Sequence, residues 1–170
     1  MHRDLPAKVR ATAAGQFPFG AIVSCMDSRV PVELVFDLTV GDAFSIRVAG
    51  NVINQDILGS LEFATQVAGA KLILVLGHTR CGAVQGAIEG VKLGNLTSLL
   101  ERIIPPGLSR PAPGEEAAWA GKVTRQNAEN SMRDIREKSP VVKRLLENGS
   151  VRLSGGIYDV ETGRVTFFDD

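Results

Sequence analysis

Residues 71–82 read KLILVLGHTRCG, and this stretch carries the strongest structural signal in the chain. Its first half, KLILVL, is a nearly continuous apolar run, which is typical of a strand that is buried on both faces of a parallel sheet. The run ends at Gly77 and is followed by a histidine and, three positions later, by a cysteine. Ligand sites in such sheets lie just beyond the carboxyl ends of the strands. We therefore expect His78 and Cys81 to lie at that edge.

Two apolar runs upstream predict further strands of the same sheet. Residues 19–24 (FGAIVS) lead directly into Cys25, and residues 43–48 (AFSIRV) are followed by the loop-like sequence AGN. A helical spacing of apolar residues over 56–67 and a short helix near Pro31 fill the intervals between the strands. This alternation indicates an α/β fold with a parallel central β-sheet flanked by helices.

The second half of the chain predicts helices and then a closing pair of strands. The predicted helices are 83–89, 96–104 and 115–147. The last of these should break at Ser139–Pro140, because proline removes a helical hydrogen bond. Prolines and glycines concentrated at 105–114 favour a surface loop over a domain boundary. Strands at 151–158 and 164–168 flank the turn ETG and predict a C-terminal β-hairpin or antiparallel edge strand.

Length and composition narrow the class of protein. The 170 residues are enough for one domain, so we expect a single domain over 1–170. Nineteen Lys and Arg residues balance nineteen Asp and Glu residues, a formal net charge of +0, which argues against nucleic acid or an anionic membrane as partner. No apolar run is long enough to span a bilayer. No export signal opens the sequence, so we expect a cytoplasmic protein unless a preceding segment carried such a signal.

Both cysteines and one of the two histidines fall at predicted strand ends. Cys25 follows one strand, and His78 and Cys81 follow another. Thiolate sulfur and imidazole nitrogen are ligands of Zn²⁺, and catalytic zinc keeps three protein ligands and one open position. A cysteine after a strand is more commonly a small buried hydrophobic residue. The coincidence of all three residues at one sheet edge nevertheless favours a metal site.

Two charged residues follow the first cysteine in the segment CMDSR. Asp27 is either a fourth metal ligand or the acceptor of a hydrogen bond from zinc-bound hydroxide. Arg29 carries a planar guanidinium that would clamp this carboxylate and keep it ionised. The residues by themselves leave both roles of Asp27 open.

The two segments together resemble the zinc motifs of the β-class carbonic anhydrases. In that family the motifs are C-x-D-x-R and H-x-x-C, and this chain reads CMDSR at 25–29 and HTRC at 78–81. The likeness covers about 15–99 and continues more weakly to the terminal hairpin. The resemblance implies a carbonate dehydratase, a zinc lyase that interconverts carbon dioxide with bicarbonate and a proton through zinc-bound hydroxide.

The resemblance also assigns roles to the residues at the sheet edge. The ligands of one Zn²⁺ per chain would be Cys25, His78 and Cys81. Asp27 and Arg29 would form the catalytic dyad, in which the carboxylate orients the hydroxide. The bicarbonate-inhibited members carry a tryptophan where this chain has Ile22. We therefore expect the plant-like, open type of site, with Asp27 paired to Arg29 and not bound to zinc.

Four further positions match the substrate pocket of the plant-like members. Gln16 stands nine positions before the first cysteine, and Phe44 stands nineteen positions after it. The backbone N–H of Gly82 would donate to bicarbonate. Those members carry a tyrosine where this chain has Phe63, so one hydroxyl is missing while the apolar wall of the pocket remains.

The family also implies an oligomer whose pocket lies between subunits, with the glutamine reaching across from the partner. Helices ahead of that glutamine usually wrap onto the partner, yet only residues 1–15 precede Gln16 here. We expect a homodimer, or a tetramer built from dimers, formed by an N-terminally shortened chain or through other surfaces. Two alternatives stay open: a zinc hydrolase of another small heterocumulene such as carbon disulfide, and an inactive zinc-binding homologue.

Overall fold

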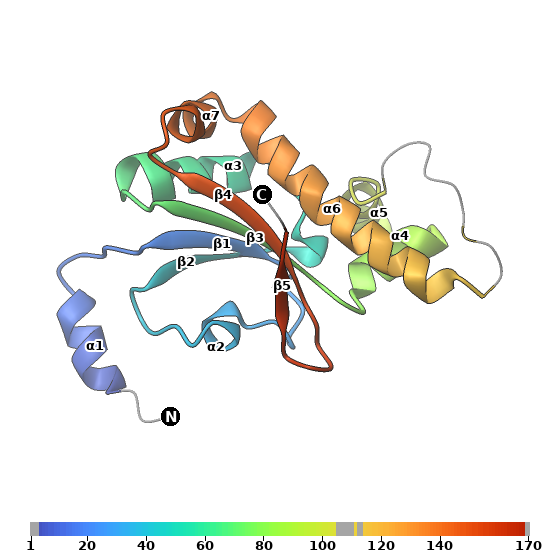
Figure 1. The fold of residues 1–170 in the computed structure, drawn as a ribbon, viewed down its shortest axis with the longest axis horizontal. Helices are drawn as coiled ribbons and strands as arrows, with labels where there is room; N and C mark the ends of the chain where they lie inside the picture. Colours follow the sequence, from blue (N-terminus) through green and yellow to red (C-terminus); the bar gives the residue numbers. More distant parts are fainter. Residues whose placement is uncertain (1–3, 105–110, 112–113, 169–170) are drawn as a thin grey trace.

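A five-stranded sheet runs through the molecule, and helices cover both of its faces (Figure 1). The computed structural model describes residues 4–104, 111 and 114–168. The strand order is β2-β1-β3-β4-β5. The strands are β1 (Gly20–Ser24), β2 (Ala43–Arg47), β3 (Leu72–His78), β4 (Arg152–Tyr158) and β5 (Val165–Phe167). The first four pair in parallel and β5 pairs antiparallel to β4, which confirms the predicted α/β fold with an antiparallel C-terminal edge.

The central strand β3 explains why its sequence is continuously apolar. Ile73 and Val75 pack into the core on one face of the sheet, and Leu74 and Leu76 pack into the core on the other face. All four side chains are buried, because helices cover both faces at this strand. Helices α3, α6 and α7 cover the first face, and α2 packs against the second (Figure 1).

The predicted helices are present, with small differences at their ends. Their bounds are α2 (Val32–Val35), α3 (Gln55–Glu62), α4 (Gly82–Glu89), α5 (Gly94–Leu100), α6 (Glu116–Lys138) and α7 (Pro140–Glu147). The break at Ser139–Pro140 is confirmed, and the Ser139 hydroxyl accepts a hydrogen bond from the Val142 N–H to cap α7. The predicted helix 56–67 consists of α3 followed by a π-helical turn, η2 (Phe63–Val67). The AGN segment forms a short 3₁₀ turn, η1 (Ala49–Asn51).

One helix of the structure was not expected from the sequence, and one expected loop lies almost wholly outside the described residues. Helix α1 (Leu5–Thr12) was not predicted, and within the described part of the chain none of its residues is buried. The surface loop expected at 105–114 lies almost wholly outside the described residues, as does His2. Among the described residues, no helix has the length and apolar character needed to cross a membrane.

Candidate metal centre

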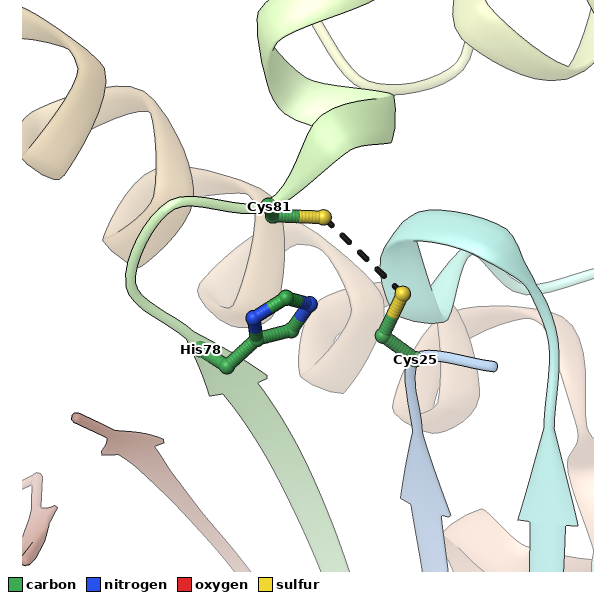
Figure 2. A group of neighbouring side chains, drawn as sticks. All are labelled: Cys25, His78 and Cys81. Atoms are coloured by element: carbon green, nitrogen blue, oxygen red, sulfur yellow. Dashed lines mark hydrogen bonds between the residues drawn. The ribbon is translucent and has the colours of Figure 1, made fainter. Parts of the chain in front are cut away.

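The carboxyl ends of β1 and β3 bring three buried ligand-type side chains together (Figure 2). Ser24 lies opposite Leu76 in the parallel register, so Cys25 leaves β1 beside the end of β3. The ligand atoms of Cys25, His78 and Cys81 all lie within 4.8 Å of one another. The two sulfurs are 3.9 Å apart, close to the roughly 3.8 Å that tetrahedral zinc with Zn–S bonds of about 2.3 Å would set.

His78 presents an unpartnered nitrogen to the two sulfurs. Its Nδ1 lies 2.9 Å from the carbonyl oxygen of Thr79, which can only accept, so Nδ1 carries the proton and donates. The Nε2 atom is buried and has no hydrogen-bond partner within residues 4–104, 111 and 114–168. A buried lone pair without a partner is costly, and a metal ion would satisfy it. This Cys₂His donor set therefore fits zinc.

The pKa values of the two cysteine thiols are shifted in opposite directions. The Cys81 thiol donates to the Cys25 sulfur and so lowers the pKa of Cys25 far below its ordinary value, and the Gly50 N–H, 3.3 Å away, contributes in the same direction. The same hydrogen bond, together with burial, raises the pKa of Cys81. The lowered pKa favours the thiolate form of Cys25, which is the form that binds metals.

A left-handed residue turns the two ligands of the second motif toward one point. Arg80 has a φ of +55°, a conformation that costs a non-glycine residue about 1–2 kcal/mol. The turn ends at Cys81, which is the N-cap of α4, and the helix begins at Gly82. An apolar cluster packs around both cysteines and includes Val52, Val84, Leu100, Ile103 and Val123.

The turn between β4 and β5 holds this ligand loop in place. The Thr79 N–H donates to the Tyr158 carbonyl, and the Thr79 hydroxyl donates to Asp159 Oδ1 at 3.2 Å. That hydroxyl also accepts a hydrogen bond from the Val160 N–H at 3.1 Å, and Arg80 forms an ion pair with Glu161 of the same turn. The pKa of Asp159 is lowered because its carboxylate accepts several hydrogen bonds, of which the one from the Glu161 N–H has the largest effect. The C-terminal hairpin therefore anchors the loop that carries two of the three ligands.

Asp27 and Arg29 form a bidentate pair beside the three ligands. Arg29 donates from Nε to Asp27 Oδ1 at 3.0 Å and from Nη2 to Oδ2 at 2.8 Å, and its backbone N–H also donates to Oδ1. These hydrogen bonds hold the pKa of Asp27 well below its usual range. Asp27 Oδ2 is 3.8 Å from His78 Nε2. An ionised carboxylate thus faces the position where the ligand atoms converge.

Sequence reasoning missed two groups that support the first motif. Arg47 donates from Nε to the Cys25 carbonyl and from Nη2 to the Asp27 carbonyl, so it ties down the backbone of the CMDSR loop. Gly50 supplies the N–H to the Cys25 sulfur. The signal was available, because Arg47 ends β2 and Gly50 follows it, and β2 reaches the same edge of the sheet as β1 and β3.

Three of the four predicted pocket residues lie away from the ligands of this chain. Phe44 and Phe63 meet edge to face, with ring centroids 6.1 Å apart, and line an open cleft of about 710 Å³ that contains none of the three ligands. Phe44 lies opposite Ala21, four positions before Cys25, which is about 13 Å along the strand. Gln16 is exposed in the segment before β1.

Gly82 is the exception among the four. It lines a separate cleft of about 550 Å³, together with the adjoining Cys81 and the first half of α6. One chain therefore assembles the ligands, the Asp27–Arg29 pair and Gly82, and leaves the aromatic wall and Gln16 elsewhere on its surface.

Comparison with known proteins agrees with this geometry. A family model described as carbonic anhydrase matches residues 20–165. Carbonic anhydrase 2 of Mycobacterium tuberculosis (strain CDC 1551 / Oshkosh) is 33% identical over 162 residues, which are 92% of this chain and 77% of that protein.

Solved structures show the same fold. The β-carbonic anhydrase CcaA has a TM-score of 0.83 at 27% identity, with 99% of this chain and 86% of that chain covered. The β-carbonic anhydrase CafA of Aspergillus fumigatus has a TM-score of 0.82 at 26% identity, with 96% and 81% covered. The matched residues include both ligand motifs, and the chain belongs to the β-class carbonic anhydrase family.

Proposed function

We propose that this protein hydrates carbon dioxide reversibly to bicarbonate and a proton, using one Zn²⁺ held by Cys25, His78 and Cys81. The observation that carries the proposal is the buried Cys₂His set, with an unpartnered His78 Nε2 and an arginine-paired carboxylate beside it. A purely structural zinc site would need no such carboxylate. Membership of the carbonic anhydrase family supports the same reaction.

The residues of the chain divide the catalytic tasks between them. When zinc is bound, it supplies a Lewis acid that brings the pKa of a coordinated water down to about 7. Asp27 stays ionised at neutral pH because Arg29 donates to both of its oxygens, so it can only accept a hydrogen bond. It would hold the proton of the attacking oxygen and turn a lone pair toward the substrate. The Gly82 N–H, at the start of α4, would bind an oxygen of bicarbonate.

The remaining pocket residues support a homodimer, or a tetramer of dimers, with the pocket between subunits. Phe44 lies about 13 Å along its strand from the level of Cys25, and Phe63 is 50% exposed. In a dimer each chain would lend Gln16, Phe44 and Phe63 to the site of the other. Helix α1, whose Leu5 and Val9 are both half exposed, has an apolar surface that a partner would cover.

Several general properties suit this function. The formal net charge of +0 fits a neutral substrate, which gains nothing from electrostatic steering. Cys25 and Cys81 are free thiols and must stay reduced to bind metal, as they would in the cytoplasm, where we place the protein. All parts of the site belong to one sheet and its flanking segments, so we treat residues 1–170 as a single zinc-binding domain.

The test combines zinc content with carbon dioxide hydration measured by stopped flow between about pH 6 and 9. The wild type should hold one zinc per chain and be active. Asp27→Asn should keep its zinc and lose about 10²- to 10⁴-fold in kcat, because the amide is neutral and can donate as well as accept. A zinc-loaded wild type without activity over this range would overturn the proposal.

A further inference from the structure

Two buried polar side chains of α6 reach the turn that supplies a hydrogen bond to Cys25. Asn127 donates from Nδ2 to the Gly50 carbonyl at 2.7 Å, and Ser131 donates from Oγ to the Asn51 carbonyl at 2.9 Å. The two donors are four positions apart on the helix, so they lie on one face, one turn after the other. Asn127 is 2% exposed and Ser131 is 4% exposed. Both hydrogen bonds are therefore buried.

The turn that they hold has a backbone that other residues would not adopt easily. Gly50 and Asn51 in η1 both have left-handed φ values, +64° and +45°. A Cβ on Gly50 would lie 2.7 Å from Ile103 Cδ1 and 3.2 Å from Ala83 Cβ, so a side chain there would displace Ile103 as well as strain the backbone. This conformation directs the Gly50 N–H at the Cys25 sulfur, 3.3 Å away.

The carbonyl and the N–H of Gly50 connect α6 to the first ligand. The carbonyl accepts from Asn127, and the N–H donates to Cys25. A hydrogen bond to a thiolate stabilises its negative charge, and the hydrogen bonds around metal ligands orient them and tune the metal. A shift of η1 away from α6 would therefore remove a donor from the sulfur.

The surrounding sequence of α6 shows that these positions are polar for a local reason. The neighbouring buried positions Val123, Ala128 and Ile135 are apolar, as expected for a helix face on the core. A buried amide is costly unless it is hydrogen-bonded. Asn127 and Ser131 lie beside the Gly50 and Asn51 carbonyls of η1, and those carbonyls accept their hydrogen bonds.

We propose that Asn127 and Ser131 are positioning residues for the metal centre, holding η1 so that Gly50 donates to the Cys25 sulfur. This inference rests on the zinc site of the proposed function and deepens it. Neither side chain belongs to the candidate ligand group of Cys25, His78 and Cys81. Their effect is on the strength and character of the Cys25–metal bond.

The experiment compares Asn127→Leu and Ser131→Ala with the wild type in two measurements. Zinc affinity is measured by competition with a chromogenic chelator, and the sulfur-to-metal charge-transfer band is measured after replacement of zinc by Co²⁺. Asn127→Leu should weaken zinc binding about 10- to 100-fold, and Ser131→Ala should weaken it less. The band should shift to lower energy in both variants, because a thiolate without its N–H donor releases charge more readily.

Thr65→Val is the matched control in a helical segment outside η1 and the metal centre. Thr65 in η2 is buried, and its hydroxyl donates to the Leu61 carbonyl of α3. The control removes a buried hydroxyl without touching η1, so its zinc affinity and Co²⁺ spectrum should equal those of the wild type. Circular dichroism and thermal melting of the metal-free chains show whether each variant folds.

The outcomes separate this inference from the proposed function. If Asn127→Leu and Ser131→Ala fold, bind zinc as tightly as the wild type and keep its Co²⁺ spectrum, the inference is wrong and the zinc site stands. A lower melting temperature with both metal readouts unchanged has the same meaning. If Asn127→Leu does not fold, Ser131→Ala decides by the same two readouts. If the wild type itself binds no zinc, the proposed function and this inference both fail.

Discussion

The metal centre and the pocket wall are built in opposite ways. Cys25, His78 and Cys81 are all buried, and backbone groups of the same chain hydrogen-bond to the side chains of Cys25 and His78. Phe63 and Gln16, in contrast, are exposed, and the cleft that Phe63 lines contains none of the ligands. From this difference we propose that one chain binds the metal by itself, whereas a second copy completes the substrate pocket.

The largest effect is expected from removing a ligand. Cys81→Ser replaces a thiol that would bind zinc as a thiolate with a hydroxyl that stays protonated, so zinc should be lost and hydration should fall by several orders of magnitude. Loss of the bound metal should also lower the melting temperature. Atomic absorption on the purified variant measures the zinc. Met26→Leu, at an exposed position beside the first ligand, should keep it, and stoichiometric zinc in Cys81→Ser would show that the ligand assignment is wrong.

A smaller effect, and the sharpest test of the comparison, is expected from the pocket wall. Phe63→Asp places a charge on a surface that we expect to be buried between subunits, where an unpaired carboxylate is costly. The variant should elute as a monomer in gel filtration, keep its zinc and lose about 10- to 100-fold in activity.

Phe63→Tyr is the matched control for this variant. It retains the ring and adds the hydroxyl of the plant-like members, so it should remain dimeric and active. A monomeric Phe63→Asp with wild-type activity would remove the need for a second copy and break the comparison between the two regions.

The smallest effect concerns the carboxylate of Asp27 beside the metal centre. The pKa of Asp27 lies below its ordinary value of about 3.9. The ionised group therefore stabilises the fold above that value, and this contribution is lost as the pH falls through the folded-state pKa. In Arg29→Gln the pKa should rise toward its ordinary value, and kcat should fall about tenfold as the carboxylate loses its orientation.

Carbon-detected NMR titration of the aspartates measures the first effect of Arg29→Gln, and stopped flow measures the second. Arg29→Lys keeps the charge without the planar fork, so it should fall between the wild type and Arg29→Gln. Identical Asp27 titrations in wild type and Arg29→Gln would mean that the guanidinium does not hold the carboxylate.

Most of the sheet could be predicted because strand signals are local. The apolar run before His78 marks β3 without reference to the rest of the chain. Helix α1 carries no such signal, since the structure buries none of its described side chains and its few apolar residues face no core. The predicted helix 96–104 ends earlier, at Leu100, although Ile103 is fully buried. Ile103 is apolar because it is buried in the core, and its spacing from Leu99 and Leu100 resembles that of a longer helix.

The C-terminal strands show where local signals stop. The hairpin was expected from its turn, but nothing in the sequence of β4 says that it pairs in parallel with β3. The packing of β4 depends in the same way on residues distant in the sequence. A Cβ on Gly155 would lie 2.5 Å from Met132 Sδ and 2.6 Å from a ring atom of Phe168. The requirement for glycine comes from a helix and an edge strand that pack against β4.

The sequence by itself determined the candidate metal ligands, because Cys25 directly follows β1, His78 ends β3 and Cys81 lies three positions beyond it, and parallel strands end at a common edge. Only the tertiary structure decided which groups hold those ligands. The hydrogen bond from Asn127 to Gly50 joins residues 77 positions apart, and the bond from Ser131 to Asn51 joins residues 80 apart. Such contacts depend on how α6 packs across the sheet, and no periodicity along the chain encodes that packing.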